Sequence, residues 1–212
     1  MNRVLSAGQD RGWRRRAAEV VALPTGGRAL DVGAGTADFT LALARQYPTA
    51  SIIALDFTQA MLALGRRKAH QEDAGRRITF LAGDALHLPF SDNTFDAVTN
   101  GFVLRNVQDI GQALAEMRRV TRPGGRVVCL ELSRPTVPLF RTLFWLYFGR
   151  LVPWLGRRIA RHAEAYRYLP ASLAGFLSAE ELKAEMERAG LEQVTYRRLM
   201  GGTVAIHMGN KL

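Results

Sequence analysis

Short apolar runs alternate with longer segments of helical spacing along most of the chain. Buried strands are predicted at residues 28–32, 51–56, 78–82, 95–100 and 126–132. The segments between several of these strands have amphipathic spacing, which predicts helices over 36–46, 59–72 and 110–121. Strands that alternate with helices indicate a mostly parallel sheet with helices on both of its faces.

Two local features refine this prediction. In the helix over 59–72, Met61, Leu62 and Leu64 are the residues expected to lie on the buried side. The run Pro123-Gly124-Gly125 is expected to form a turn directly before the strand at 126–132.

The end of the chain follows a different pattern. A helix is predicted over 179–189, and the apolar segments 192–199 and 204–208 flank Met200-Gly201-Gly202-Thr203, which is typical of a hairpin. Two closing strands added to the five earlier ones predict an α/β, doubly wound, seven-stranded sheet with a C-terminal antiparallel hairpin. We expect a single domain over 1–212, with residues 134–176 as an inserted lobe.

Composition narrows the class of protein, and charge is unevenly distributed. The chain has 212 residues, is 48% hydrophobic and carries a net charge of +10, so disorder is not expected. The excess lies in residues 1–28 (net +4) and 134–168 (net +6), while the rest is neutral, which indicates an anionic surface or ligand. The single cysteine, Cys129, excludes a disulfide framework and is expected in the core of a protein from a reducing compartment.

A glycine loop follows the first predicted strand. The sequence Asp31-Val-Gly33-Ala-Gly35-Thr36 allows a tight turn and a close approach of backbone to a ligand, beside the free N–H groups of a helix start. A dinucleotide-binding loop needs Gly or Ala at position 38, where this chain has Asp38. An acid there would face a pyrophosphate, so the loop favours a ligand without one.

Two more acids stand at the ends of the next two predicted strands. Asp56 ends the second strand, where a carboxylate can accept both hydroxyls of a ribose. Asp84, followed by Ala85, ends the third, where a carboxylate can accept a hydrogen bond from an exocyclic amine such as that of adenine. Each acid alone could simply cap a helix or a turn, but their joint placement beside the glycine loop favours a nucleoside site.

Together these stretches resemble the S-adenosylmethionine-binding motifs of class I methyltransferases. The Rossmann-like fold of that family has a seven-stranded sheet closed by an antiparallel hairpin, as predicted above. The resemblance implies that the cofactor is bound by the glycine loop, the strand-end acids and the fourth strand, through Asp31, Gly33, Gly35, Thr36, Asp56, Asp84, Ala85 and Asn100. A carboxylate-lined pocket suits the sulfonium cation.

Further stretches resemble one branch of that family, the ubiquinone/menaquinone biosynthesis C-methyltransferases. The most specific are Leu104-Arg105-Asn106-Val107 and Tyr166-Arg167-Tyr168-Leu-Pro170, and the match covers nearly the whole chain. Val103 stands where many members have glycine, and so does Ala37. Members usually carry about one more helix before Asn2, with a Tyr-Asp pair just upstream of that position.

The resemblance implies methyl transfer to a ring carbon of a prenylated hydroquinone, such as demethylmenaquinol. Arg105 and Asn106 are predicted to hold the quinol oxygen and any water that relays its proton, with Tyr166 as a second candidate. Arginine stabilises a phenolate but is a poor base. The alternatives are a structural salt bridge for Arg105 and simple packing for Tyr166. No metal is expected, because the four histidines show no ligand spacing with Cys129.

The proposed lobe has a composition of its own. Within residues 137–155, aromatic and apolar side chains are interrupted by Arg141 and Arg150, too closely for a membrane span. Such a segment can enter a membrane interface while its arginines meet anionic headgroups, or it can line an apolar pocket. We therefore expect a cytoplasmic protein, peripheral at the inner face of the cytoplasmic membrane, where a prenylated quinol is found. The sequence does not decide between a monomer and a homodimer.

Other functions compete with this interpretation. Methylation of a ubiquinone precursor would use the same mechanism, and the sequence does not separate it from menaquinone synthesis. Methylation of nucleic acid would use the basic segments as phosphate contacts, but the neutral cofactor-binding half makes it the runner-up. A non-enzymatic quinone- or membrane-binding scaffold would bind no cofactor.

Overall fold

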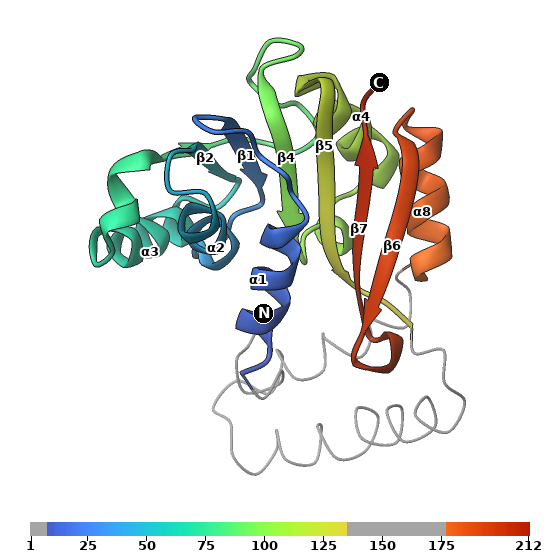
Figure 1. Cartoon of the computed structure of the whole chain (residues 1–212), viewed down its shortest axis with the longest axis horizontal. Helices are drawn as coiled ribbons and strands as arrows, with labels where there is room; N and C mark the ends of the chain where they lie inside the picture. The colour runs from blue at the N-terminus through green and yellow to red at the C-terminus, as the bar shows by residue number, and fades with distance from the viewer. Residues whose placement is uncertain (1–7, 135–176) are drawn as a thin grey trace.

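The protein is an α/β fold built on one seven-stranded sheet (Figure 1). The structure is a computed structural model that describes residues 8–134 and 177–212. The strands, in chain order, are β1 (Arg28–Val32), β2 (Ser51–Asp56), β3 (Ile78–Ala82), β4 (Phe95–Gly101), β5 (Thr121–Leu132), β6 (Glu192–Leu199) and β7 (Val204–Asn210). Their order in the sheet is β3-β2-β1-β4-β5-β7-β6.

The first five strands are parallel, and the last two close the sheet. β7 pairs antiparallel with both β5 and β6, which confirms the predicted hairpin and the seven-stranded fold class. The chain order reverses between β1 and β4, which are hydrogen-bonded neighbours. Ligands of such sheets bind at this reversal, outside the carboxyl ends of the strands.

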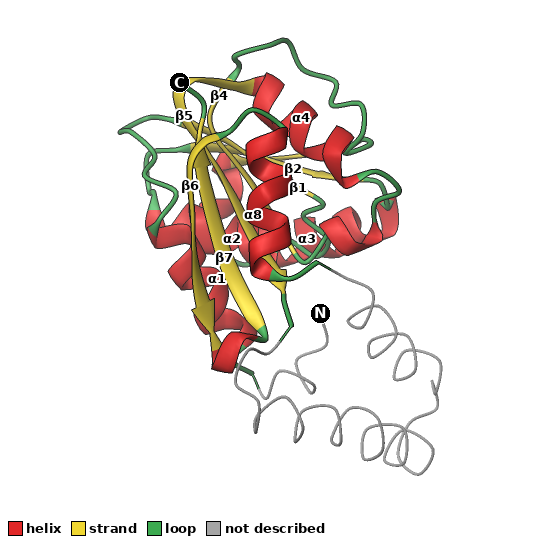
Figure 2. Ribbon diagram, turned by 90° about the vertical axis from the view of Figure 1, so that its right-hand side faces the viewer, coloured by secondary structure: helices red, strands yellow, loops and turns green. Residues whose placement is uncertain are grey.

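Helices cover both faces of the sheet (Figure 2). One face carries α1 (Asp10–Glu19) and α2 (Asp38–Gln46), and the other carries α4 (Ile110–Val120) and α8 (Ala179–Arg188). The helix α3 (Gln59–His70) packs against β2 and β3. The short 3-10 turns are η1 (Asp73–Arg77), η2 (Leu104–Asn106) and η4 (Met200–Gly202).

Each face has its own hydrophobic core. On the first face, Trp13 of α1 and Leu43 of α2 pack over the middle strands. On the other face, Met117 of α4 and Met186 of α8 pack over the same strands. Cys129 lies fully buried in this second core, as expected, and burial raises the pKa of its thiol well above the ordinary value. The two cores hold the strand ends rigidly on either side of the sheet.

Four details differ from the sequence prediction. Helix α1 was not predicted, because its arginine-rich sequence has few large apolar residues. Helix α2 begins at Asp38 rather than at residue 36, because the glycine loop continues to Ala37. The expected turn at 123–125 is instead an irregular stretch inside β5, where the pairing register with β4 shifts.

The fourth difference concerns helix α3. Only Leu62 of the three expected core residues is buried, since the helix packs through Leu62, Gly65 and Ala69. This leaves Met61 and Leu64 exposed. The prediction was wrong for these two because Met61 and Leu64, three residues apart, share a face of the helix, and the face that meets the sheet is the one with Leu62, Gly65 and Ala69.

The lobe predicted at 134–176 lies outside the described residues except for Arg134, and so does Tyr166. Among the residues that are described, no helix is both long enough and apolar enough to cross a bilayer.

Candidate functional site

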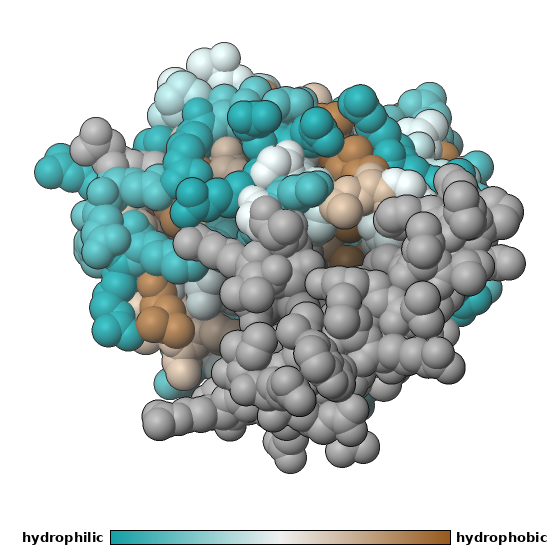
Figure 3. Space-filling view, turned by 90° about the horizontal axis from the view of Figure 1, so that it is seen from below, coloured by the Kyte–Doolittle hydropathy of each residue, from teal (hydrophilic) through white to brown (hydrophobic). Residues whose placement is uncertain are grey.

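A cavity of about 760 Å³ opens at the carboxyl ends of β1, β2 and β4. It lies where the strand order reverses, and α1 contributes Arg14 to its wall. The view from below shows apolar atoms recessed among polar ones at this end of the molecule (Figure 3). This size falls within the range of small-molecule and cofactor pockets.

The glycine loop forms one wall of the cavity through its backbone. Gly33 and Gly35 have φ values of 66° and 55°, in the left-handed region that favours glycine. A Cβ atom on Gly33 would also lie only 2.4 Å from a methyl carbon of Val103. The loop therefore needs glycine at 33, both for its backbone angle and because the chain after β4 passes so close.

Asp56 fixes the loop from the end of β2. Its two carboxylate oxygens accept hydrogen bonds from the backbone N–H groups of Gly35 (2.7 Å) and Thr58 (2.8 Å). Each oxygen has a second lone pair, so the carboxylate can still accept two hydroxyls from a ligand in the cavity. Asp56 is half-buried and lines the cavity, and ribose binding by it stays a prediction.

Asp31 lies deeper, at the end of β1. The hydroxyls of Thr40 and Thr99 donate to its carboxylate at 2.6 Å and 3.0 Å. Burial raises the pKa of Asp31 to about 6, against these two hydrogen bonds, which lower it. A cation bound in the cavity would stabilise its ionised form.

Asp38 is part of a network that ties α2 to α3. Lys68 donates to Asp38 (2.9 Å) and to the hydroxyl of Thr36 (2.7 Å), and that hydroxyl contacts the other oxygen of Asp38. Partial burial alone would raise the pKa of Asp38, but the hydrogen bond and charge of Lys68 hold it below the ordinary value. This network fixes the start of α2, so Thr36 and Asp38 hold the end of the glycine loop.

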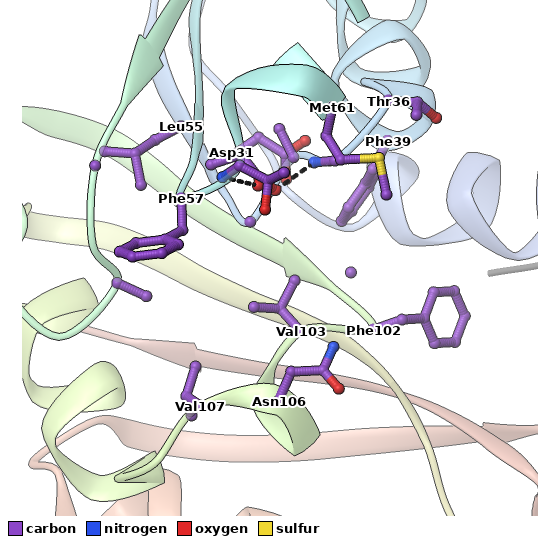
Figure 4. Close-up of a pocket in the computed structure, with 18 of the residues that line it drawn as sticks. Asp31, Thr36, Phe39, Leu55, Phe57, Met61, Phe102, Val103, Asn106 and Val107 are labelled. Atoms are coloured by element: carbon purple, nitrogen blue, oxygen red, sulfur yellow. Dashed lines mark hydrogen bonds between the residues drawn. The ribbon is translucent and has the colours of Figure 1, made fainter. Parts of the chain in front are cut away.

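The third strand end completes this wall of the cavity. Asp84 and Ala85 line it, and Asp84 accepts a hydrogen bond from the backbone N–H of Leu86 at 2.9 Å. Phe57 and Met61 border the same space, and Phe57 is 81% exposed. Figure 4 shows Met61 on one side of the cavity and Asn106 on the other. Exposed apolar side chains beside a carboxylate suit a flat aromatic ring with an amine, such as adenine.

The opposite wall comes from the turn η2, which carries Arg105 and Asn106. The Arg105 side chain is only 8% exposed, and its Nη1 lies 3.9 Å from Oε2 of Glu131 on β5. The other carboxylate oxygen of Glu131 accepts from the backbone N–H groups of Val103 (2.6 Å) and Leu104 (2.8 Å). Among the described residues, Nε and Nη1 of Arg105 and Oε2 of Glu131 have no hydrogen-bond partner.

Burial raises the pKa of Glu131 to about 7, against Arg105 and the backbone donors, which lower it. The salt bridge considered for Arg105 is therefore present but loose, since 3.9 Å is beyond hydrogen-bond distance. Arg105 is among the residues that line the cavity, so the contact does not remove it from the site.

The structure brings together all the predicted site residues that it describes except Asn100, and Tyr166 lies outside the described residues. The cavity is lined by Asp31, Gly33, Gly35, Thr36, Asp56, Asp84, Ala85, Arg105 and Asn106. Asn100 does not line it: its side chain is fully buried and its amide contacts the sulfur of Met117 in the second core. Successive residues of a strand point to opposite faces, so Thr99 reaches Asp31 while Asn100 points to α4.

Arg14 is a cavity residue that the sequence interpretation missed. Its buried guanidinium binds the Asp10 carboxylate at 2.7 Å and lies 5.3 Å from the centre of the Phe102 ring. No specific signal in the sequence marks it, since it is one of several arginines before residue 20. Its position in the cavity depends on α1, which was not predicted.

Comparison with known proteins gives a consistent match over the whole chain. The model of the ubiE/COQ5 methyltransferase family matches residues 1–211. The demethylmenaquinone methyltransferase of Roseiflexus castenholzii is 48% identical over 211 residues, which is all of this chain and 87% of that protein. The proteins of that name from Shouchella clausii and Staphylococcus aureus are 44% and 42% identical, again over all of this chain and over 90% and 87% of theirs.

Solved structures agree with the fold. An S-adenosylmethionine-dependent methyltransferase from Aquifex aeolicus superimposes with a TM-score of 0.68 at 16% identity, over 94% of this chain and 89% of that one. The carbon methyltransferase CurJ gives 0.68 at 19% identity, over 93% of this chain and 54% of that one. At such identities the likeness concerns the fold alone.

Proposed function

Because this chain belongs to the ubiE/COQ5 methyltransferase family, we propose that it methylates a ring carbon of demethylmenaquinol with S-adenosylmethionine as the methyl donor. One observation carries the proposal: a cavity at the sheet's reversal has strand-end carboxylates on one wall and a buried arginine on the other. The relatives that match this chain over its full length are named demethylmenaquinone methyltransferase, after this reaction. The protein is thus an S-adenosylmethionine-dependent methyltransferase.

The residues of the first wall fit the parts of S-adenosylmethionine. We assign the ribose hydroxyls to Asp56, which lines the cavity and has lone pairs left to accept them, and the adenine to Asp84 and Ala85, beside the exposed ring of Phe57. Asp31 places negative charge near the sulfonium and ammonium groups. Asn100 is not assigned a direct contact, because its side chain faces the other side of the sheet.

The α-carboxylate of the cofactor is assigned to Arg14. Its guanidinium is the cationic group that α1 places on the cavity wall, and its planar donors suit a carboxylate. Arg14 and Asp31 would then hold the two ends of the zwitterionic amino acid.

The second wall is assigned to the quinol. When bound, S-adenosylmethionine supplies an electrophilic methyl group, so the new carbon–carbon bond forms as the methyl–sulfur bond breaks with its electron pair left on sulfur. Arg105 stabilises the negative charge that grows on the ring oxygen, and Asn106 orients that oxygen by hydrogen bonding. Much of the remaining acceleration comes from holding the ring carbon in line with the methyl group.

A substrate panel tests this assignment. Purified protein is incubated anaerobically with labelled S-adenosylmethionine and a short-chain demethylmenaquinol, a ubiquinone-type precursor, or transfer RNA. We expect the label in the demethylmenaquinol. Preferential labelling of the ubiquinone-type precursor or of RNA would reject the substrate assignment, and failure to bind S-adenosylmethionine by calorimetry would favour the scaffold alternative.

We also propose that the protein collects its substrate at a membrane surface. Support comes from composition alone: residues 134–168 carry a net charge of +6, and aromatic side chains are concentrated at Phe140, Phe144, Trp145, Tyr147, Phe148 and Trp154. Sedimentation with anionic vesicles at low salt should recover most of the protein, and high salt should release part of it. Equal binding to neutral and anionic vesicles would show that the arginines do not contribute to membrane binding.

A further inference from the structure

The contact between Glu131 and Arg105 is unusual for a buried ion pair. Glu131 is fully buried and the Arg105 side chain nearly so, yet their closest charged atoms are 3.9 Å apart. Three polar atoms at this contact lack hydrogen-bond partners among the described residues: Oε2 of Glu131 and Nε and Nη1 of Arg105. Leaving buried polar atoms unpaired is costly, and native structures do so rarely.

A separation of 3.9 Å is short enough for one oxygen atom to form hydrogen bonds with both side chains. An oxygen about 2.8 Å from both Nη1 of Arg105 and Oε2 of Glu131 would accept from the first and donate to the second. A water molecule has both capacities, whereas a second carbonyl or carboxylate does not. Arg105 lines the cavity and Glu131 does not, so this oxygen would connect the cavity to Glu131.

We propose that Glu131 takes up the proton of the substrate's ring hydroxyl through a water held between Glu131 and Arg105. It acts as a positioning residue as well, because its other oxygen fixes the turn that carries Arg105 and Asn106. This inference rests on the proposed quinol methylation and names the proton acceptor for that reaction. Arg105 is unsuited to this task, because a guanidinium does not give up its proton in proteins and so cannot act as a base.

Two protons move in each turnover, and one of them is released. The ring O–H bond breaks, its electron pair enters the ring, and the proton passes through the water to Oε2 of Glu131. After methylation, the C–H bond at the methylated carbon breaks, its electron pair restores the aromatic ring, and this proton leaves to solvent. Glu131 then returns its proton to the ring oxygen, so each turnover releases one proton and regenerates the carboxylate.

The charge state of Glu131 suits this role. Its pKa of about 7 means that the carboxylate can both accept and return a proton near neutral pH. Activity should therefore rise with pH as Glu131 ionises, through about pH 7. Two other titratable groups on this face of the sheet fall outside that range: burial lowers the pKa of His207 to about 4 and raises the pKa of Cys129 well above its ordinary value.

The pKa of Asp31 is about 6, so the effect of its ionisation on the pH profile must be distinguished from that of Glu131. Because Asp31 lies on the cofactor wall, its ionisation should affect the affinity for S-adenosylmethionine. Single-turnover methyl transfer at saturating S-adenosylmethionine removes that contribution and leaves the proton transfer.

The test compares Glu131→Gln with Glu116→Gln. Glu116 is a matched control outside the cavity, because it too accepts a backbone N–H, from Leu88, and pairs with an arginine, Arg119. We expect Glu131→Gln to slow single-turnover methyl transfer by about 100-fold or more and to lose the rise through pH 7. Its affinity for S-adenosylmethionine should stay within about threefold of wild type.

Several outcomes would overturn the inference. Wild-type pH dependence and rate in a folded Glu131→Gln variant would show that Glu131 takes up no proton. If that variant does not fold, the carboxyl of Glu131 can be titrated by carbon-13 NMR in the wild type, and an apparent pKa below 5 would contradict the proposal. If the wild type itself leaves demethylmenaquinol unmethylated while binding S-adenosylmethionine, the proposed function fails first.

Discussion

The two walls of the cavity differ in how completely their polar atoms are paired. On the wall built by β1 and β2, the carboxylates of Asp31 and Asp56 each accept two hydrogen bonds from the protein. On the wall built by η2, Arg105 lies 3.9 Å from Glu131 of β5, which stands behind the wall, and both side chains have buried polar atoms without partners among the described residues. The polar groups of the first wall are already held in place for the cofactor. The buried polar atoms at the second wall find their hydrogen-bond partners only when water and substrate are bound.

This difference has a consequence for mutations. Changes on the first wall should weaken cofactor binding and leave the chemical step intact. Changes on the second wall should slow the chemical step and leave cofactor binding intact. Substitutions of Arg105, Asp56 and Arg14 test that separation.

The largest effect is expected for Arg105→Met. The change removes the cation that stabilises the ring oxygen, and removal of a comparable electrostatic donor from an active site costs about 100- to 1,000-fold in kcat. Rapid-quench measurement of methyl transfer checks the rate, and calorimetry should find affinity for S-adenosylmethionine within about threefold of wild type. Arg122→Met, which removes a partner of Asp96 away from the cavity, is the control. A loss of cofactor affinity as large as the loss of rate would show that the two walls do not have separate functions.

The next largest effect is expected for Asp56→Asn. A hydrogen bond to a charged group contributes about 1.5–3 kcal/mol, so affinity for S-adenosylmethionine should fall by about 10- to 100-fold. Methyl transfer at saturating cofactor should stay close to the wild-type rate. Asp96→Asn is a matched control, because Asp96 accepts the backbone N–H of Arg28 at 2.7 Å outside the cavity. Unchanged affinity of Asp56→Asn for S-adenosylmethionine would show that Asp56 does not bind the ribose.

A smaller and more selective effect is expected for Arg14→Met. Loss of the carboxylate partner should weaken S-adenosylmethionine binding by about tenfold. Binding of 5′-methylthioadenosine, which lacks the amino-acid part, should not change. Since Arg14 also pairs with Asp10, general damage to α1 would weaken both ligands equally, and calorimetry with both would reveal it.

The smallest effect concerns stability and Asp31. Its folded-state pKa of about 6 exceeds the ordinary 3.8, so its contribution to stability is fully present below about pH 4 and is lost as pH rises through 6. Between pH 7.5 and 5, the wild type should gain about 1 kcal/mol of unfolding free energy relative to Asp31→Asn. Glu131 and His207 titrate in both proteins, so their contributions to the pH dependence of the unfolding free energy cancel in the comparison. Denaturant unfolding at the two pH values measures the difference, and parallel pH dependence in both proteins would contradict the raised pKa.

The fold was predictable because its strands are short apolar runs with clear breaks. The failures have local causes. Helix α1 carries too few large apolar residues to show periodicity, and Met61 looked like a core residue because sequence alone does not show which side of α3 meets the sheet. The irregular stretch at Gly124 depends on pairing with β4, which lies outside any local window.

The candidate site was predictable where a residue type is tied to a strand end. Asp31, Asp56 and Asp84 follow from that rule, since all three strands are parallel and end on one edge. Asn100 also ends a strand, but its side chain faces the wrong side of the sheet. Arg14 and Glu131 act through tertiary contacts, so their roles become visible only when α1 and β5 are in place.

The most direct test of the account follows the methyl group itself. Wild-type protein is incubated under reducing, anaerobic conditions with S-adenosylmethionine labelled with carbon-13 in its methyl group and with a short-chain demethylmenaquinol. The account predicts that NMR of the extracted quinone finds the label bonded to the ring carbon. Label on a ring oxygen, or no labelled quinone although S-adenosylmethionine binds, would contradict it.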